Sequence, residues 1–217
     1  MLIPLCKPRL ASFGGLACLT LAARSGDGPQ SNVVLEGSPA AVQSAALLVS
    51  GDPLGSYGEA FTDSEGRGFI LVGPNDGQGA QALYRLDGGT IRRAPGEVAG
   101  PVTLNQASSM KLRTSAVTLA QLAGNYTIRF GGDGADFRLD ADGKLTAAGG
   151  ACQLSGTLRT DSSVPGTLPL TLTIAGCTLA GSYDGYAIRS LDYQPAAFRL
   201  VADDGKRVLD GYAVSYR

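Results

Sequence analysis

Few residues in this sequence have types and spacings that could carry out catalysis. The 217 residues include no histidine, which excludes Ser-His-Asp triads, Cys-His pairs and histidine-ligated metal sites. Ser108 and Lys111 have the Ser-x-x-Lys spacing of penicillin-interacting enzymes, but the Ser-Asp-Asn and Lys-Thr-Gly motifs that accompany it are missing from the sequence. The spacing requires a helix, whereas the sequence SMKLR favours a strand, in which Ser108 and Lys111 point to opposite faces. We therefore expect no catalytic residue and no enzyme.

The acidic motifs are better explained as turns than as metal sites. The sequence DADG at 140–143 begins like a calcium loop, but Lys144 occupies the third acidic position and no glutamate follows at the twelfth. The glycines at 131–134 lead into a strand-like sequence, so they do not form a nucleotide-binding loop. Glycosidases need two carboxylates about 5–9 Å apart in space, which sequence spacing does not fix. We expect no metal and no cofactor.

The composition favours short strands joined by tight turns. Glycine accounts for 31 residues, about twice its usual share, and only 17% of residues are charged. The net charge of −1 gives no basic surface for nucleic acid or anionic lipid. Tryptophan does not occur in the sequence, which weakens any proposal of carbohydrate stacking.

The N-terminus has the features of an export signal. Basic residues precede a weakly apolar run at 10–23, which is shorter than the roughly 20 apolar residues that cross a bilayer. Two prolines and a glycine pair disfavour a buried helix instead. Either Cys18 becomes the lipidated first residue, or an ordinary signal peptidase cuts near Ala22 or Ala23. We assign residues 1–23 to a signal peptide.

Three further regions follow the signal. Residues 24–42 are rich in Gly, Ser and Pro and are expected to form a flexible tether. Residues 43–114 contain strand-like runs separated by turn signals, which predict a small antiparallel sheet. A short helix is then predicted, because Thr118 and Gln121 have capping-box spacing and Gly124 suits the position after a helix end.

Residues 115–217 show the clearest pattern, an alternation of apolar and polar residues along about seven strands. Such alternation buries one face and leaves the other in water. The aromatic and aliphatic residues that carry it include Tyr126, Ile128, Phe130, Phe137, Leu139, Leu168, Leu170, Leu172, Ile174, Val208, Tyr212, Val214 and Tyr216. Asp142-Gly143 and Asp204-Gly205 predict hairpin turns. We expect an all-β protein whose second region is an up-and-down barrel, or a partly closed barrel or sandwich, because closure removes exposed edges.

Glycine and tyrosine recur together in this sequence. Gly-polar-Tyr occurs at 55–57, 124–126 and 181–183, and we interpret it as a glycine that lets the neighbouring tyrosine ring lie across the backbone. Tyr183 and Tyr186 have opposite phases, and a β-bulge at Asp184-Gly185 would return both to one face. If the barrel carries a ligand, the aromatic candidates inside it are Tyr126, Phe130, Phe137, Tyr183 and Phe198.

Cys152 and Cys177 are the two cysteines outside the N-terminal region. In an exported protein such a pair predicts a disulfide, worth about 3 kcal/mol in the chain-entropy model. If both began strands separated by a third flat strand, they would be about 9.5 Å apart, too far for a bridge. One of them must therefore lie in a crossing turn, or the middle strand must end early. Two buried thiols or metal ligands are the alternatives.

The second β region resembles the glycine-rich β domain of small, mostly uncharacterised Gram-negative lipoproteins. Their pattern GxY…DGxLT…GCxxSGTL…C…GTYxG corresponds to residues 124–126, 142–146, 151–158 and 177–183. Two positions depart from it: Ala151 replaces a glycine, and Arg24 stands where the anchor cysteine is expected. The resemblance implies an envelope β protein with no assigned activity.

Three functions are compatible with these features. The first is a non-enzymatic exported protein of the periplasm or outer membrane that binds a protein partner, such as an envelope protein or a toxin that it neutralises, and touches the membrane only through a lipid anchor. It predicts a packed interior and an apolar or aromatic surface patch. A carrier of small apolar ligands predicts an open cavity of several hundred Å³. A hydrolase predicts a cleft with two close carboxylates and a raised pKa.

Overall fold

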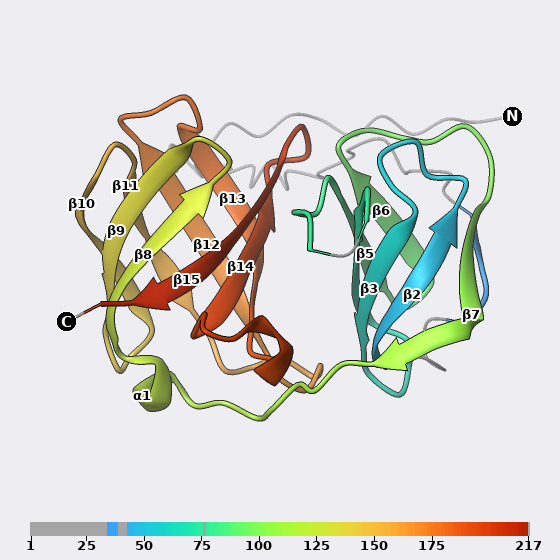
Figure 1. Ribbon diagram of the computed structural model, residues 1–217, viewed down its shortest axis with the longest axis horizontal. Coiled ribbons are helices and arrows are strands. Elements are labelled where there is room, and N and C mark those ends of the chain that lie inside the picture. Colours follow the sequence, from blue (N-terminus) through green and yellow to red (C-terminus); the bar gives the residue numbers. More distant parts are fainter. Residues whose placement is uncertain (1–33, 39–42, 76, 217) are drawn as a thin grey trace, which may run out of the picture.

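The computed structural model describes residues 34–38, 43–75 and 77–216, and within them the chain is almost entirely β (Figure 1). A seven-stranded sheet has the strand order β1-β7-β2-β3-β4-β5-β6, and eight further strands form a closed barrel. The elements are β1 (Leu35–Glu36), β2 (Ser44–Ser50), β3 (Tyr57–Thr62), β4 (Gly68–Gly73), β5 (Ala82–Asp87), β6 (Thr90–Ala94), β7 (Val102–Lys111), α1 (Leu119–Leu122), β8 (Gly124–Phe130), β9 (Asp133–Leu139), β10 (Lys144–Gly150), β11 (Gln153–Leu158), β12 (Thr167–Ala175), β13 (Gly181–Ile188), η2 (Leu191–Tyr193), β14 (Phe198–Asp203) and β15 (Val208–Ser215).

Several predictions for the N-terminal part fall outside these residues. The signal peptide and the candidate lipidation residue Cys18 lie outside the described ranges. Leu35 and Glu36 belong to the segment expected to be a tether, and here they form β1, which pairs in parallel with β7. Within the described ranges, no helix has the length and apolarity that a membrane crossing requires.

The N-terminal sheet is strongly curved around a core of its own. Its inner face buries aliphatic side chains of β2 to β7 around Tyr84. Asp52, which follows β2, forms an ion pair with Arg93 of β6 at 2.9 Å, although three strands separate β2 from β6 in the sheet. Both side chains are almost completely buried and also hydrogen-bond the Tyr84 hydroxyl. The sheet must therefore curl until the end of β2 approaches β6.

The C-terminal barrel confirms the up-and-down prediction. Its strands follow one another in chain order from β8 to β15, and β15 pairs with β8 to close the ring. The alternating apolar residues of β8, β9 and β12 point inward and form a buried cluster. An eight-stranded barrel is just wide enough for side chains to fill it. The alternation in the sequence thus predicted the barrel interior on these strands.

On β15 the predicted phase of the alternation is wrong. Leu209, Gly211 and Ala213 face the barrel interior, whereas Val208, Tyr212 and Val214 face outward. The reason is crowding by β8. A Cβ atom on Gly211 would lie 2.8 Å from Ile128 and 3.0 Å from Phe130, so only small residues fit this part of the interior. The larger side chains of Tyr212 and Val214 are left on the surface.

The predicted β-bulge at Asp184-Gly185 is also wrong. β13 pairs in continuous register with β12 and β14 across these residues. Tyr183 points into the barrel, and Tyr186 points outward, where its ring stacks on Phe69 of the N-terminal sheet at a centroid distance of 3.9 Å. The two tyrosines have opposite phases because they belong to two different cores.

The short helix before the barrel has the predicted start but not the predicted end. Thr118 and Gln121 form the capping box, and α1 covers Leu119–Leu122. Gly124 does not act as a left-handed cap: Ala123 is extended, with φ −61° and ψ 129°, and the chain enters β8 directly. The predicted hairpin turns at Gly143 and Gly205 are present, both glycines having positive φ.

Two copies of the sequence Leu-Ala-Gly-x-Tyr begin strands at opposite ends of the barrel. The Tyr126 hydroxyl donates to the Leu122 carbonyl at 2.6 Å, and the Tyr183 hydroxyl donates to the Leu179 carbonyl at 2.7 Å. A Cβ atom on Gly124 or Gly181 would lie 3.3–3.6 Å from the ring of the tyrosine two residues later. The interpretation of Gly-polar-Tyr is confirmed at these positions. It fails at Gly55, where a Cβ atom would instead meet the Gly73 backbone at 1.9 Å.

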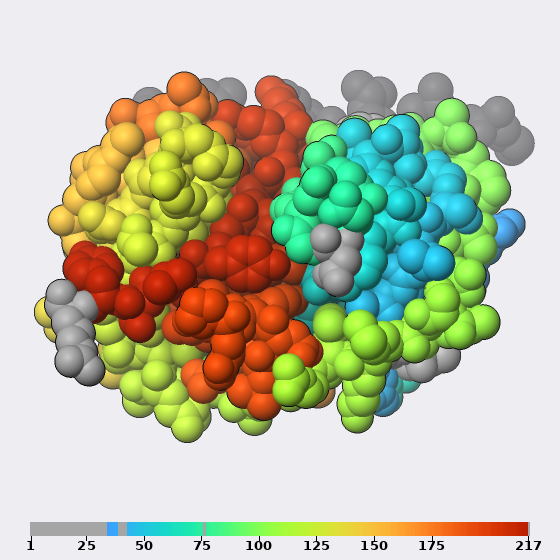
Figure 2. Space-filling model, viewed as in Figure 1, coloured from blue at the N-terminus to red at the C-terminus, as the bar shows by residue number. Residues whose placement is uncertain are grey.

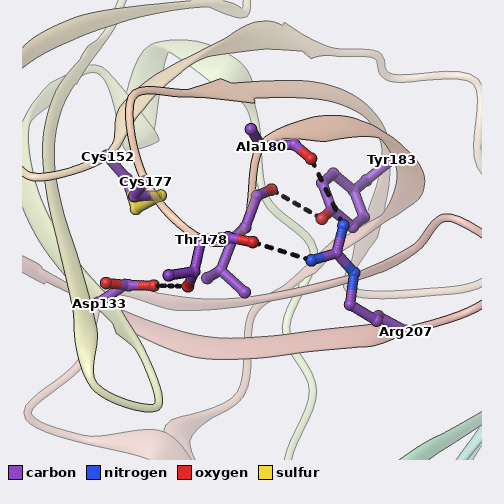
Figure 3. Close-up of a disulfide and its surroundings, with 8 residues drawn as sticks. Asp133, Cys152, Cys177, Thr178, Ala180, Tyr183 and Arg207 are labelled. Carbon is purple, nitrogen blue, oxygen red and sulfur yellow. Dashed lines mark hydrogen bonds between the residues drawn. A yellow bond between two sulfur atoms is a disulfide. The ribbon is translucent and has the colours of Figure 1, made fainter.

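Cys152 and Cys177 form a disulfide with a Cα–Cα distance of 5.1 Å (Figure 3). Cys152 directly precedes β11, and Cys177 lies in the turn after β12, next to the paired residues Gln153 and Ala175. The expected geometric obstacle is avoided because Cys177 belongs to this turn and not to β13. Arg207 from the β14–β15 turn donates to the carbonyl of Thr178 at 3.1 Å, which fastens the same turn from its other side.

The two β units share a third core. It joins barrel-facing residues of the sheet to outward-facing residues of β13 and β14, and it contains Ala46, Phe61, Phe69, Leu71, Ala80, Leu83, Leu112, Val164, Ile188, Tyr193, Ala196 and Val201. The segment between β7 and α1 runs beneath both units (Figure 1). The apolar runs GFILVG and FRLVA are buried on both faces for this reason.

Polar contacts also cross this shared core. The Arg85 guanidinium pairs with Asp203 and hydrogen-bonds it at 2.9 Å. The Ser163 hydroxyl donates to Asp63 at 2.8 Å. Burial opposes ionisation of Asp63, but hydrogen bonds from Ser163, Arg67 and nearby backbone amides outweigh it and lower its pKa to about 2. Asp63 is therefore ionised wherever the protein is folded at ordinary pH.

Candidate functional site: a cleft between the two units

The aromatic residues predicted to bind a ligand inside the barrel are packed against one another. All five belong to the barrel core. The Tyr126 ring lies 4.8 Å from that of Phe198 and 5.6 Å from that of Phe137. The exposed fractions of all five side chains are 6% or less. None of them lines the cleft described below. The structure thus brings the candidates together, but as the filling of the barrel.

The other chemistry-bearing motifs have structural roles. Ser108 and Lys111 lie on strand β7, as expected, and the Ser108 hydroxyl donates to the Asn105 carbonyl at 3.0 Å. The DADG sequence forms the β9–β10 turn. Asp133, Cys152 and Cys177 place potential ligand atoms within 4.8 Å of one another, but both sulfur atoms are used in the disulfide.

A hollow lies where the two units meet, along the seam between barrel and sheet (Figure 2). Its volume is about 630 Å³. The walls come from β3, β4 and the end of β7 on one side, and from η2, the start of β14 and β15 on the other. Lining residues used below are Tyr57, Glu59, Met110, Lys111, Arg113, Asp192, Tyr193, Arg199, Tyr212 and Val214. We call this hollow the cleft.

Buried charges form the floor of the cleft. Arg199 on β14 pairs with Glu59 across the two units and with Asp210 on β15 at 2.6 Å. Its guanidinium lies 5.5 Å from the centre of the Tyr193 ring and 5.2 Å from that of Tyr212. Asp210 also accepts from the backbone amide of Ala80 in the sheet unit. One guanidinium therefore holds two carboxylates and two rings, and it links the units.

The protonation of this floor follows from burial. Desolvation raises the pKa of Glu59, because the attraction of Arg199 does not fully compensate for it and the charge of Asp210 adds to it. Tyr193 is likewise shifted upward by desolvation, so its pKa keeps the hydroxyl neutral. The Tyr193 hydroxyl contacts both Glu59 and Arg199, at 3.4 and 3.3 Å. These contacts occupy the polar groups of the floor with one another.

Large apolar side chains surround the mouth of the cleft and remain exposed. Met110 at the end of β7 is 64% exposed, and Tyr212 and Val214 from β15 and Tyr216 just after it are 37–42% exposed. Met110, Tyr212 and Val214 line the cleft itself, and Tyr216 directly follows β15. We call these four residues the rim patch. Contiguous exposed apolar surface next to a hollow is typical of a binding site, and tyrosine and methionine are enriched in protein interfaces.

Sequence reasoning missed the cleft residues. Glu59 and Arg199 are 140 positions apart, so no local motif connects them. A weak signal exists, because each is a charged residue inside an otherwise apolar strand, GEAFT and FRLVA. A buried charge of this kind requires a partner. The rim patch was missed because the phase of β15 was assigned the other way round.

Comparisons of the chain with protein-family models, with curated proteins and with solved structures give no match. The cleft is therefore interpreted from its own geometry. It can receive an apolar side chain or a small apolar molecule above a polar floor in which Arg199 pairs with both Glu59 and Asp210.

Proposed function

We propose that this protein is a non-enzymatic binding protein of the cell envelope that captures a protein partner at the cleft and its rim patch. One observation carries the proposal: large apolar side chains are exposed beside a cleft of about 630 Å³, while the barrel interior is filled by its own side chains. A partner that inserted an apolar residue into the cleft would remove the rim patch from water. Such an anchor surrounded by a covering ring is how most interfaces concentrate their binding energy.

An envelope location is supported by the disulfide and by the N-terminal sequence. Structural disulfides form and persist in oxidising compartments such as the periplasm. We propose export through the predicted signal, followed by either lipidation of Cys18 or cleavage near Ala23. A lipid-anchored chain would be held at the outer membrane, and a cleaved chain would be free in the periplasm. The intact mass of the membrane-extracted protein distinguishes the two forms.

Binding explains the cleft better than hydrolysis does. A carboxylate hydrolase needs two acidic groups that can reach a substrate. Glu59 has the raised pKa that such an enzyme uses, but it is paired with Arg199. Both oxygens of Asp210 accept hydrogen bonds from Arg199. Arg199 thus occupies the space between the carboxylates that a substrate would need.

Transport of a small apolar ligand is a second candidate, favoured by the volume of the cleft. Sites for small molecules have about 300–1,000 Å³ and commonly lie between domains. The cleft falls within this range. Because the barrel interior is filled, we place this alternative in the cleft, with Tyr57 and Met110 as its apolar walls.

A variant of the rim patch tests the proposal. Met110, Tyr212 and Val214 are replaced together by serine, and Val34, an apolar residue with 58% exposure just before β1 and beside the start of β7, is replaced by serine as the control. Proteins captured from the periplasm of the native host are quantified for both variants and for the unaltered chain. We expect one or a few proteins to be lost with the triple variant and retained with the control. Equal capture by all three chains would contradict the proposal.

A further inference from the structure

Two cations flank the rim patch. Lys111 follows Met110 in β7, lines the cleft and is exposed. Arg129 is exposed on the outer face of β8, two residues after Thr127, which pairs with Val214 of β15, and its backbone lies beside Gly211, the residue before Tyr212. The rim patch is therefore bordered by a positive charge from the sheet unit and by another from the barrel.

These two cations differ from most other cations near the seam. Arg113 is paired with Asp192, Arg199 with Glu59 and Asp210, and Arg85 with Asp203. Within the part of the chain that the structure describes, Lys111 and Arg129 form no ion pair.

The nearby carboxylates do not compensate Lys111 and Arg129. Asp192 accepts two hydrogen bonds from Arg113. Asp136 lies beside Gly149 of β10, with a carboxylate oxygen 3.5 Å from the Cβ position of that glycine, on the side away from β15. The binding surface thus combines an apolar centre with two uncompensated positive charges at its border.

From this arrangement we infer that the partner presents an acidic segment, in which an aliphatic or aromatic residue enters the cleft and carboxylates on either side meet Lys111 and Arg129. The inference rests on the proposed function and specifies the chemistry of the partner. Charge complementarity at an interface directs association and selects among partners, while the apolar anchor supplies most of the affinity. A neutral or basic segment would leave both cations without a partner on binding.

Peptide selection on the full chain tests this chemistry. A display library of random 12-residue peptides is selected against the protein, and the enriched peptides are synthesised with a fluorescent label. Their affinities are measured by anisotropy for the unaltered chain and for Lys111→Glu, Arg129→Glu and Tyr212→Ser. Lys206→Glu is the control, because this exposed lysine lies in the β14–β15 turn, which is not part of the cleft.

We expect peptides that combine apolar residues with Asp or Glu. Tyr212→Ser abolishes their binding, each reversal of Lys111 or Arg129 weakens it about threefold or more, and Lys206→Glu leaves it unchanged. Binding also weakens as salt is raised from 50 to 300 mM.

Three results would overturn the inference. Peptides whose binding depends on Tyr212 but that carry no acidic residues refute the acidic partner and leave the proposed function standing. The same holds for peptides whose affinity is unchanged by both Lys111→Glu and Arg129→Glu. Selection that yields no peptide dependent on Tyr212 refutes both. The third result has two parts: selection yields no acidic peptide, and the chain binds phosphatidylglycerol vesicles in a way that Lys111→Glu and Arg129→Glu abolish. It would identify an anionic lipid surface as the partner in place of a protein.

Discussion

Replacement of Arg199 by methionine tests how the two units are joined. The Arg199 side chain is only 4% exposed and holds Glu59 and Asp210, whose side chains are also buried. Its removal leaves two buried carboxylates without a cation. The loss of one partner from a buried ion pair costs about 3–5 kcal/mol. We expect a loss of this size in the free energy of unfolding, measured by urea denaturation followed by circular dichroism at pH 7.

Two further measurements make this prediction specific. A triple variant that adds Glu59→Gln and Asp210→Asn removes the unpaired charges, so it should recover most of the lost stability. The loss in the single variant should also be smaller at pH 4 than at pH 8. Burial raises the pKa of Glu59, so its contribution to stability is present when it is protonated and is lost as pH rises through that pKa. A loss under about 1 kcal/mol, or a triple variant no more stable than the single one, would refute the reasoning.

Three other predictions concern the barrel and the seam. Reduction of the Cys152–Cys177 disulfide, which closes a loop with a sequence separation of 25, should lower the free energy of unfolding by about 3–4 kcal/mol. The midpoint of thermal unfolding should then fall by roughly 6–15 °C. The same midpoint with and without reductant would contradict a stabilising role of the disulfide. Tyr126→Phe and Tyr183→Phe should each lower the free energy of unfolding in urea by about 1 kcal/mol, because each removes one hydrogen bond to a backbone carbonyl and keeps the ring. A loss of stability in only one of the two variants would show that the two Leu-Ala-Gly-x-Tyr sequences are not equivalent. Since the pKa of Asp63 is lowered to about 2, the stability that its ionised form adds to the folded protein is complete above the unfolded pKa near 4 and is lost as pH falls toward 2. Asp63→Asn should therefore reduce the loss of stability between pH 4 and pH 2. The same acid-induced loss in the variant and in the unaltered chain would contradict this.

The sequence predicted the barrel where the alternation of residues had one interpretation. On β8, β9 and β12 the apolar residues share one phase, and a single buried face follows. β15 carries apolar residues in both phases, so its orientation depended on the space left by Ile128 and Phe130, which are distant in sequence. Crowding of this kind is a tertiary property, and a pattern within one strand does not contain it.

The cleft could not be predicted for a related reason. It exists because the outer faces of β13 and β14 pack on the N-terminal sheet, and the sequence left open whether the two units share a core. Tyr186 is an example: its phase suggested an irregular strand, whereas it belongs to the shared core and stacks on Phe69. The cysteine pairing was predictable from the number of cysteines and the predicted export, and the register of Gln153 with Ala175 then removed the geometric obstacle.

Site-specific photo-crosslinking in the native host tests the central claim most directly. A photoreactive amino acid is placed at Val214 in the rim patch and, in a separate chain, at Val34, just before β1 and beside the start of β7. We expect one discrete crosslinked protein for position 214 and none of that mass for position 34. The same crosslinked protein at both positions, or no crosslinked protein at position 214, would contradict a partner bound at the cleft.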